Sequence, residues 1–291
     1  RILAVLGARG LLRPGEVVPA PRVSLLDLSR VHSMAYLESL NDPTVLGRIF
    51  GIDAADMLID LPLDAQRHAV GGTLAAARSV IEREARVAVN LGGGLHHAHR
   101  DRAAGYCFFN SVALAAEVVT RCWATPVVIA DFGAFHGAGT QQIFSSRGDV
   151  GYVSVHQYPA FPGTGGADEI GDDEGLGATR NVPLAAGSND EVVSAAFESA
   201  LWEVCGRLRP RAVLLAAGFD GHRDDPVGGL GLTDNGYGRL TATAVRAAET
   251  WCEGRIVSFL EGGYDLHALA NCARVHAEVL ANSAVDSAPR S

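Results

Sequence analysis

The sequence predicts an α/β fold, with a single doubly wound, mostly parallel sheet flanked by helices. Short apolar runs alternate with longer helical segments, and no internal repeat or low-complexity linker interrupts them. The chain has 291 residues, which suits one large domain with a sizeable core. Several of the apolar runs end in glycine followed by acidic, histidine or tyrosine residues, where open α/β sheets place their ligand sites.

The apolar runs predict strands buried on both faces of the sheet, because they are short, continuous and rich in β-branched residues. These strands are expected at 86–91, 127–130, 150–156, 211–217 and 255–260.

Helices are expected between the strands, and Asn110, Asn189 and Thr233 are suitable N-caps for three of them. Residues 51–66 are expected to form a loop, and 159–177 a long loop of the kind that often binds ligands. The expected helices cover 28–40, 72–86, 110–121, 189–208, 233–252 and 266–280.

We expect one domain over residues 1–280 and a flexible tail over 281–291, which is small and polar. The chain starts at Arg1 rather than Met, so we expect that some upstream sequence is missing. The net charge of −9 argues against a nucleic-acid partner, because binding phosphates needs a basic surface. No apolar run approaches the roughly 20 residues of a membrane span, and there is no signal peptide. Five scattered cysteines without a C-x-x-C pair predict free thiols in a reducing compartment, which we take to be the cytoplasm.

Four of the predicted strand ends should meet on one side of the sheet. His96 and His97 follow three glycines and are either two solvated imidazoles in a turn or an acid–base pair. Asp220 is either a loop acid or a carboxylate metal ligand. Tyr264, after two glycines, is either a packing residue or a hydroxyl that polarises a carbonyl. The fourth end begins at Asp131.

Other segments near these ends are typical of turns alone. They are Asp225-Pro226 and the F-P-G-T-G segment at 161–165.

Taken together, these pieces resemble the histone deacetylase and acetylpolyamine amidohydrolase family, which has the arginase/deacetylase fold. The resemblance covers most of the chain, from about Val31 to Asp265. The matching motifs are L-x-x-V-H at 28–32, G-G-G-L-H-H-A at 92–98, G-Y-C-F-F-N at 105–110, D-x-x-x-x-H-G-x-G-T-Q at 131–141, V-S-V-H at 153–156, F-P-G-T-G at 161–165, G-F-D-G-H-R-D-D-P-V-G-G-L-G-L-T at 218–233 and E-G-G-Y at 261–264.

The resemblance implies a role for each matching residue. In the family, a zinc ion held by Asp, His and Asp at the bottom of a narrow tunnel activates water against an acyl-lysine or acyl-amine carbonyl. The implied catalytic residues are the tandem pair His96 and His97, the orienting Asp131 and the carbonyl-polarising Tyr264. Gly105 and Tyr106 match the tunnel wall that contacts the substrate, and Asp220 matches the last zinc ligand.

The sequence departs from the family pattern D-x-D-x-H-H-G-[ND]-G at the metal ligands. Gly133 stands where the first zinc Asp is expected, and Phe135 stands where the zinc His is expected. Ala138 replaces the residue that supports the second histidine. Because a catalytic zinc site needs about three protein ligands, these differences predict that zinc is bound poorly or is absent.

A second family site survives in the pattern. The family binds a monovalent cation largely through backbone carbonyls, so we expect a potassium-type site. Its matching positions are Asp131, Gly133, Phe135, Ser154 and Val155.

Three hypotheses follow for function. The first is a deacetylase-like tunnel that is not an ordinary zinc deacetylase, and that binds an acylated or amine ligand or runs metal-free acid–base chemistry with His96, His97 and Tyr264. The second is an active zinc-dependent amidohydrolase with an altered metal site. The third is a catalytically dead pseudoenzyme that acts as a binding partner, and an oligomer is compatible with any of them.

Overall fold

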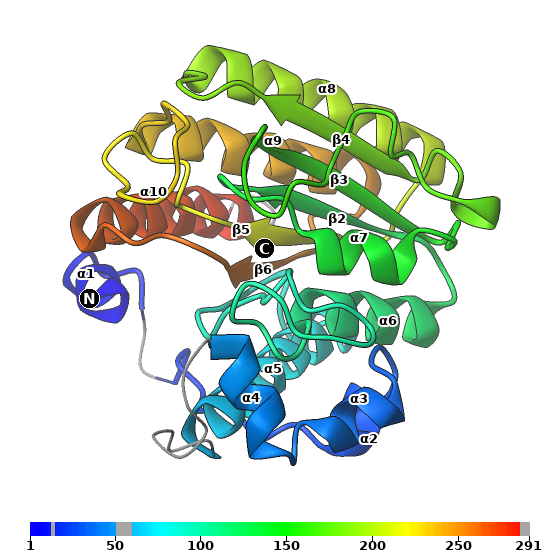
Figure 1. The fold of residues 1–291 in the computed structure, drawn as a ribbon. Helices are drawn as coiled ribbons and strands as arrows, with labels where there is room; N and C mark the ends of the chain where they lie inside the picture. The colour runs from blue at the N-terminus through cyan, green and yellow to red at the C-terminus, as the bar shows by residue number, and fades with distance from the viewer. Residues whose placement is uncertain (13–14, 51–59, 286–291) are drawn as a thin grey trace.

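The fold is a six-stranded parallel sheet with helices on both faces (Figure 1). The structure is a computed structural model that describes residues 1–12, 15–50 and 60–285. The strand order is β1-β6-β5-β2-β3-β4, so the chain leaves the β1 edge, crosses to the centre and builds outward on each side. This confirms the expected fold class. The strands are β1 (Val87–Asn90), β2 (Val127–Phe132), β3 (Val150–Gln157), β4 (Thr179–Leu184), β5 (Val213–Ala217) and β6 (Ile256–Leu260).

The helices form two layers, and each layer buries its own hydrophobic cluster against the sheet. Helices α5 and α6 cover one face, together with the N-terminal α2 and α3, while α8, α9 and α10 cover the other (Figure 1). The helices are α1 (Ile2–Ala8), α2 (Leu25–Leu28), α3 (Met34–Ser39), α4 (Pro43–Phe50), α5 (Asp60–Ile81), α6 (Ser111–Trp123), α7 (Ala138–Phe144), α8 (Asp190–Leu208), α9 (Asp234–Trp251) and α10 (Leu266–Val285).

Three helices begin where their capping residues predict. Asn110 accepts a hydrogen bond from the backbone N–H of Ala113, and Asn189 accepts one from Val192. Thr233 accepts from Gly236 in the same way. Each side chain satisfies a backbone donor that the first helical turn leaves unpaired, which fixes the start of α6, α8 and α9.

Several expected boundaries were wrong. The helix expected at 28–40 is two short helices, α2 and α3, because the chain turns between them. Helix α5 begins at Asp60, so residues 60–66 are helical rather than loop, while 51–59 lie outside the described residues. Strand β4 was not expected, because its sequence T-R-N-V-P-L lacks an apolar run. Helix α7 was also missed.

The expected tail at 281–291 begins later than predicted. Helix α10 continues through Val285, and 286–291 lie outside the described residues. In the part of the chain that the structure describes, no helix is long and apolar enough to cross a membrane.

The sheet order explains how one site is assembled. The four strands whose ends carry unusual residues are β1, β6, β5 and β2, which are consecutive neighbours. All four run in parallel, so their carboxyl ends lie along one edge. Segments that are far apart in the sequence therefore meet there, as the sequence predicted.

Candidate active site

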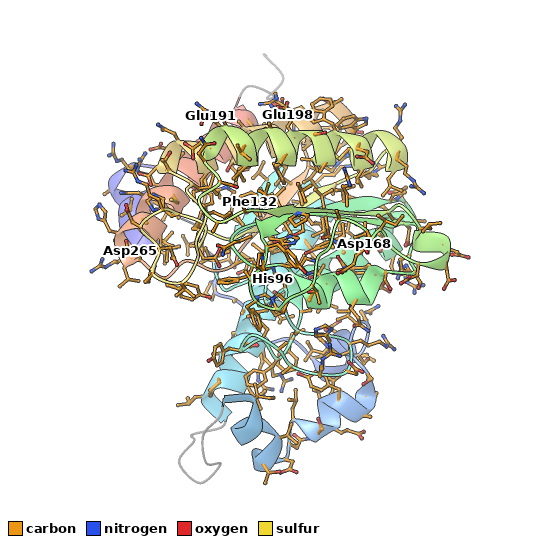
Figure 2. The ribbon with its side chains drawn as sticks, turned by 45° about the horizontal axis from the view of Figure 1, so that its top comes forward. His96, Phe132, Asp168, Glu191, Glu198 and Asp265 are labelled. Carbon is orange, nitrogen blue, oxygen red and sulfur yellow. The ribbon has the colours of Figure 1, made fainter. Side chains whose placement is uncertain are left out.

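The first histidine of the pair is held by a buried carboxylate. His96 Nδ1–H donates to Asp131 Oδ2 at 2.9 Å, and the hydroxyl of Tyr152 donates to the same oxygen at 2.9 Å. Asp131 is the fifth residue of β2, and only 1% of its surface is exposed. Figure 2 places His96 near the centre of the molecule, away from the rim where Asp265 lies. Because Nδ1 is fixed as the donor, the other ring nitrogen points towards the second histidine.

Charge keeps His96 protonated. Burial by itself lowers the pKa of His96, but the negative charges of Glu261 and Asp131 outweigh it and raise this pKa to about 10. His96 is thus an imidazolium that donates from both nitrogens. The Glu261 carboxylate accepts the backbone N–H of His96 at 3.4 Å, and burial raises the pKa of Glu261 to about 7.

The second histidine is neutral and only half partnered. His97 Nε2 accepts from His96 Nε2–H at 3.2 Å, so the proton of His97 lies on Nδ1. Within the described residues, this buried Nδ1 has no hydrogen-bond partner. Burial lowers the pKa of His97 to about 2, and the charge on His96 adds to the effect.

Asp220 lies at the bottom of the site with one oxygen already engaged. Its Oδ1 accepts the backbone N–H of Ala134 at 2.6 Å, and the residue is 4% exposed. The carboxylate fits between two glycines, because a Cβ on Gly133 or Gly262 would lie 2.8 or 1.9 Å from its oxygens. Burial raises the pKa of Asp220 to about 6. The backbone of Ala134 and the absence of side chains at the two glycines therefore define the position of this carboxyl.

Aromatic rings line the space beside Asp220. Phe161 packs edge-on against His97, with ring centroids 5.1 Å apart, and against Phe135 at 6.2 Å. The segment at 161–165 thus contributes a ring to the site, and the interpretation of it as a turn alone was incomplete. Thr164 in this segment hydrogen-bonds His136 Nδ1 at 2.8 Å, which fixes the segment against the end of β2.

Tyr264 is placed at the site through its backbone. Its N–H donates to Asp225 Oδ2 at 2.7 Å, so the carboxylate of Asp225 ties the 261–265 segment to the 218–233 segment. The prediction that Asp225-Pro226 forms only a turn was therefore wrong. The Tyr264 side chain is 53% exposed, and burial followed by the charge of Asp220 raises its pKa to about 12. Its hydroxyl is thus a neutral donor.

The remaining predicted residues border the same site. Gly105 lies against the ring of His97, since a Cβ there would come within 2.5 Å of Cδ2. The neighbouring Tyr106 is exposed. Ser154 faces Asp131 across the β2–β3 ladder, and its hydroxyl hydrogen-bonds His156 Nδ1 at 2.9 Å.

Comparison with known proteins places this arrangement in a family. Residues 1–280 match the family model described as the histone deacetylase domain. The chain belongs to the histone deacetylase family. The expected resemblance is thus confirmed over a longer stretch than the motifs covered.

Several curated proteins are similar to this deacetylase-family chain. It is 34% identical over 249 residues to the "Probable deacetylase" of Archaeoglobus fulgidus, covering 84% of the chain and 68% of that protein. It is 33% identical to the "Acetoin utilization protein AcuC" of Bacillus subtilis, covering 87% of the chain and 67% of that protein. The "Histone deacetylase-like amidohydrolase" of Pseudomonas aeruginosa is 35% identical, with 91% and 70% covered.

A solved structure shares the fold. The crystal structure of the HDA15 HD domain matches this deacetylase-family chain with a TM-score of 0.83 and 29% identity. The match covers 96% of this chain and 81% of that one.

Sequence reasoning missed three residues of the site, namely Tyr152, Glu261 and Asp225. Tyr152 lies inside an apolar strand, where nothing distinguishes it from a core residue. Glu261 follows an apolar strand directly, and a charge in that position was a usable signal. Asp225 precedes proline, a pattern that also occurs in ordinary turns.

Proposed function

We propose that this deacetylase-family protein uses its tunnel to bind an amine or acyl-amine ligand, and that it does not hydrolyse amides by the family's zinc mechanism. The observation that carries the proposal is the set of residues at the three family metal positions. Gly133 offers no side chain, Phe135 offers a phenyl ring, and Asp220 alone offers a ligand atom. Catalytic zinc sites use about three protein ligands and keep one position open, so these residues do not fit zinc.

The contacts of Asp220 support this reading. Its Oδ1 accepts from Ala134 N–H, and burial raises its pKa to about 6 although the positive charge of His96 lowers it. The ring of Phe135 is apolar, and it supplies nothing to complete a coordination shell.

The acidic residues around Asp220, which we call the floor of the site, favour a positively charged group on the ligand. Three acidic groups, Asp220, Glu261 and Asp131, act on the imidazolium of His96, which is the cation facing them among the described residues. A protonated amine near Asp220 offsets that excess of negative charge. The faces of Phe135 and Phe161 are suited to an ammonium or to its alkyl chain. The neutral hydroxyl of Tyr264 is available to an acyl oxygen.

Metal-free acid–base chemistry is a second candidate, favoured by the His96–His97 pair. A charged imidazole 3.2 Å from a neutral one is an acid beside a base. Binding alone needs no proton transfer, so substitution of His97 separates the two. If the protein only binds its ligand, His97→Gln should change the Kd for that ligand by no more than a few-fold. If His97 moves protons, the same substitution should abolish turnover.

We also propose that a monovalent cation of the potassium type binds where β2 meets β3. The register pairs Asp131 with Ser154, and the residues expected to contribute carbonyls lie on these two strands and the turn that follows β2. Thermal stability measured in potassium and in sodium chloride at equal ionic strength tests this. Equal melting temperatures in the two salts would contradict it.

Restoring the two family side chains tests the main proposal. We expect the wild-type protein to leave acetyl-lysine peptides and acetylpolyamines intact in the presence of zinc. The double variant Gly133→Asp/Phe135→His should bind one more zinc ion per chain than wild type does. Adding Asp220→Asn to that double variant should remove this ion again.

The single variants Gly133→Asp and Phe135→His are the matched controls, because each leaves the ligand set incomplete. Zinc-dependent hydrolysis by the wild-type protein that disappears with Asp220→Asn would overturn the proposal and favour an altered but active metal site. The absence of any amine or acyl-amine binding would instead favour a pseudoenzyme that acts through its surface.

A further inference from the structure

We propose a second, separate metal site built by His222, Asp234 and Cys272, which binds a divalent transition metal such as zinc. These residues come from three segments, namely the loop after β5, the first turn of α9 and the middle of α10. One ligand atom from each lies within 4.8 Å of the other two. In the described part of the chain, this is the group of three such ligand atoms that could hold a metal. It does not include Asp220.

Two of the three distances between the ligand atoms are close to the edge of a coordination tetrahedron. His222 Nε2 lies 3.3 Å from Asp234 Oδ1, and Cys272 Sγ lies 3.3 Å from the same oxygen. Ordinary zinc–ligand bonds of about 2.0–2.3 Å at tetrahedral angles put ligand atoms roughly 3.4–3.6 Å apart. Two of the three separations are thus close to this length, and the third, between His222 and Cys272, is within 4.8 Å, so a metal can enter once these two side chains draw together.

The chemistry of the three ligands selects the class of metal. A thiolate, an imidazole and a carboxylate together suit zinc, and they do not suit the all-oxygen shells of calcium or magnesium. His222 and Cys272 are buried, whereas the side chain of Asp234 is 38% exposed. The fourth position therefore opens towards solvent on the Asp234 side, where water completes the shell.

Protons occupy the place of the metal in the free protein. The thiol of Cys272 donates to Asp234, and His222 Nε2–H faces the same oxygen. Nδ1 of His222 accepts the backbone N–H of Asp224 at 3.1 Å, which sets this tautomer. On binding, the thiol proton leaves to solvent and the imidazole carries its proton on Nδ1 instead of Nε2, which requires the Asp224 N–H to give up its hydrogen bond to Nδ1. A divalent ion with one thiolate and one carboxylate is then neutral, as a buried site requires.

A partner for the shifted proton is already present. A carboxylate oxygen of Asp224 lies 3.7 Å from His222 Nδ1. Metal-binding histidines commonly donate their second N–H to a carboxylate, which orients the ring. The metal would link the segment that carries Asp220 to α9 and α10, two helices that also contact each other through apolar packing and through the hydrogen bond between Thr241 and His276.

Metal binding to the purified, chelator-treated full chain tests the proposal. We expect one equivalent of zinc per chain by elemental analysis, and with Co²⁺ the near-ultraviolet charge-transfer band of a thiolate ligand. Zinc at a hundredfold excess over its Kd should raise the Tm by roughly 5 °C. Cys272→Ser and Asp234→Asn should each weaken binding roughly 100-fold or more.

Two control variants make the outcome specific. Cys252→Ser changes another buried thiol, whose contact with the Pro210 carbonyl a serine can keep, and should bind zinc as wild type does. Asp220→Asn should also leave this ion in place.

Zinc lost with Asp220→Asn but kept with Cys272→Ser would overturn the proposal and place the metal in the tunnel. An absence of both the Co²⁺ band and the Tm rise in wild type would also overturn it. If Cys272→Ser does not fold, the Co²⁺ spectrum of wild type and the zinc affinity of Asp234→Asn test the proposal instead. The proposed function does not depend on this site, because that proposal fails through zinc-dependent hydrolysis at Asp220 or through a lack of amine binding, and neither outcome involves Cys272.

Discussion

The two sides of the candidate active site differ in how completely their polar groups are paired. On the histidine side, Asp131 accepts from both His96 and Tyr152, and the nearby negative charges outweigh the effect of burial on the pKa of His96. On the floor, Asp220 has one backbone donor for Oδ1, and glycine and phenylalanine stand at the neighbouring family positions. The second histidine belongs partly to each side, because one of its nitrogens is bonded and the other is not.

This contrast shows which part of a deacetylase-like site has its charges balanced without a metal ion. A carboxylate–imidazolium pair is complete without a metal, because each charge neutralises the other inside the protein. A metal floor is a set of anionic and polar ligands that needs a cation to be satisfied. In this chain glycine and phenylalanine stand at two of the family's ligand positions, and the remaining carboxyl accepts a backbone N–H while burial raises its pKa to about 6.

The largest expected effect is on the histidine side. Asp131→Ala leaves a buried imidazolium without its partner and removes the acceptor of Tyr152, so we expect a loss of about 3–5 kcal/mol in unfolding free energy. Asp220→Ala leaves only the Ala134 N–H unsatisfied and should cost about 1–3 kcal/mol. Chemical denaturation of both variants measures the difference. Asp149→Ala, which removes a surface partner of Arg147, is the control and should cost roughly 1 kcal/mol or less.

Equal losses of unfolding free energy for Asp131→Ala and Asp220→Ala would contradict this difference between the two sides. They would mean that Asp220 stabilises the protein as much as Asp131 does, which a bound cation at Asp220 would explain.

The second prediction is that the contribution of Asp220 to the unfolding free energy depends on pH. The pKa of Asp220 is raised to about 6 in the folded protein from an unfolded value near 3.8. The protonated form is therefore favoured by folding, and its stabilisation is complete below pH 4 and is lost as the pH rises through 6. The unfolding free energy of wild type relative to Asp220→Asn should fall by an amount on the order of 3 kcal/mol from pH 4 to pH 7.

Unfolding curves of both proteins at four pH values between 4 and 7 measure this difference. Asp168→Asn, which changes an exposed carboxylate, should give a flat difference over the same range. A flat profile for Asp220→Asn as well would show that a cation keeps the Asp220 carboxyl ionised.

The fold and the location of the site could be predicted from sequence because both depend on local patterns. Apolar runs gave five of the strands, and their glycine-rich ends located the histidine pair, Asp131, Asp220 and Tyr264. Strand β4 escaped, because an edge strand with Arg180, Asn181 and Pro183 has no apolar run. The convergence of His222, Asp234 and Cys272 could not be predicted, since it depends on how α9 and α10 pack against each other and not on any spacing in the chain.

The smallest expected effect on stability comes from His97 Nδ1, which lies between the histidine side and the floor. His97 Nδ1–H is buried without a hydrogen bond of ordinary geometry, although the backbone of His136 is close enough to act on the pKa of His97, and Ala138 stands where the family pattern has an amide or a carboxylate. Ala138→Asn should provide that acceptor and stabilise the protein by about 1 kcal/mol. Ala138→Val adds similar bulk without an acceptor and should destabilise it, because the position is tightly packed. A Tm for Ala138→Asn at or below that of Ala138→Val would mean that Nδ1 already has a partner, such as a bound water. His97 would then be fully paired, and only Asp220 would distinguish the floor from the histidine side.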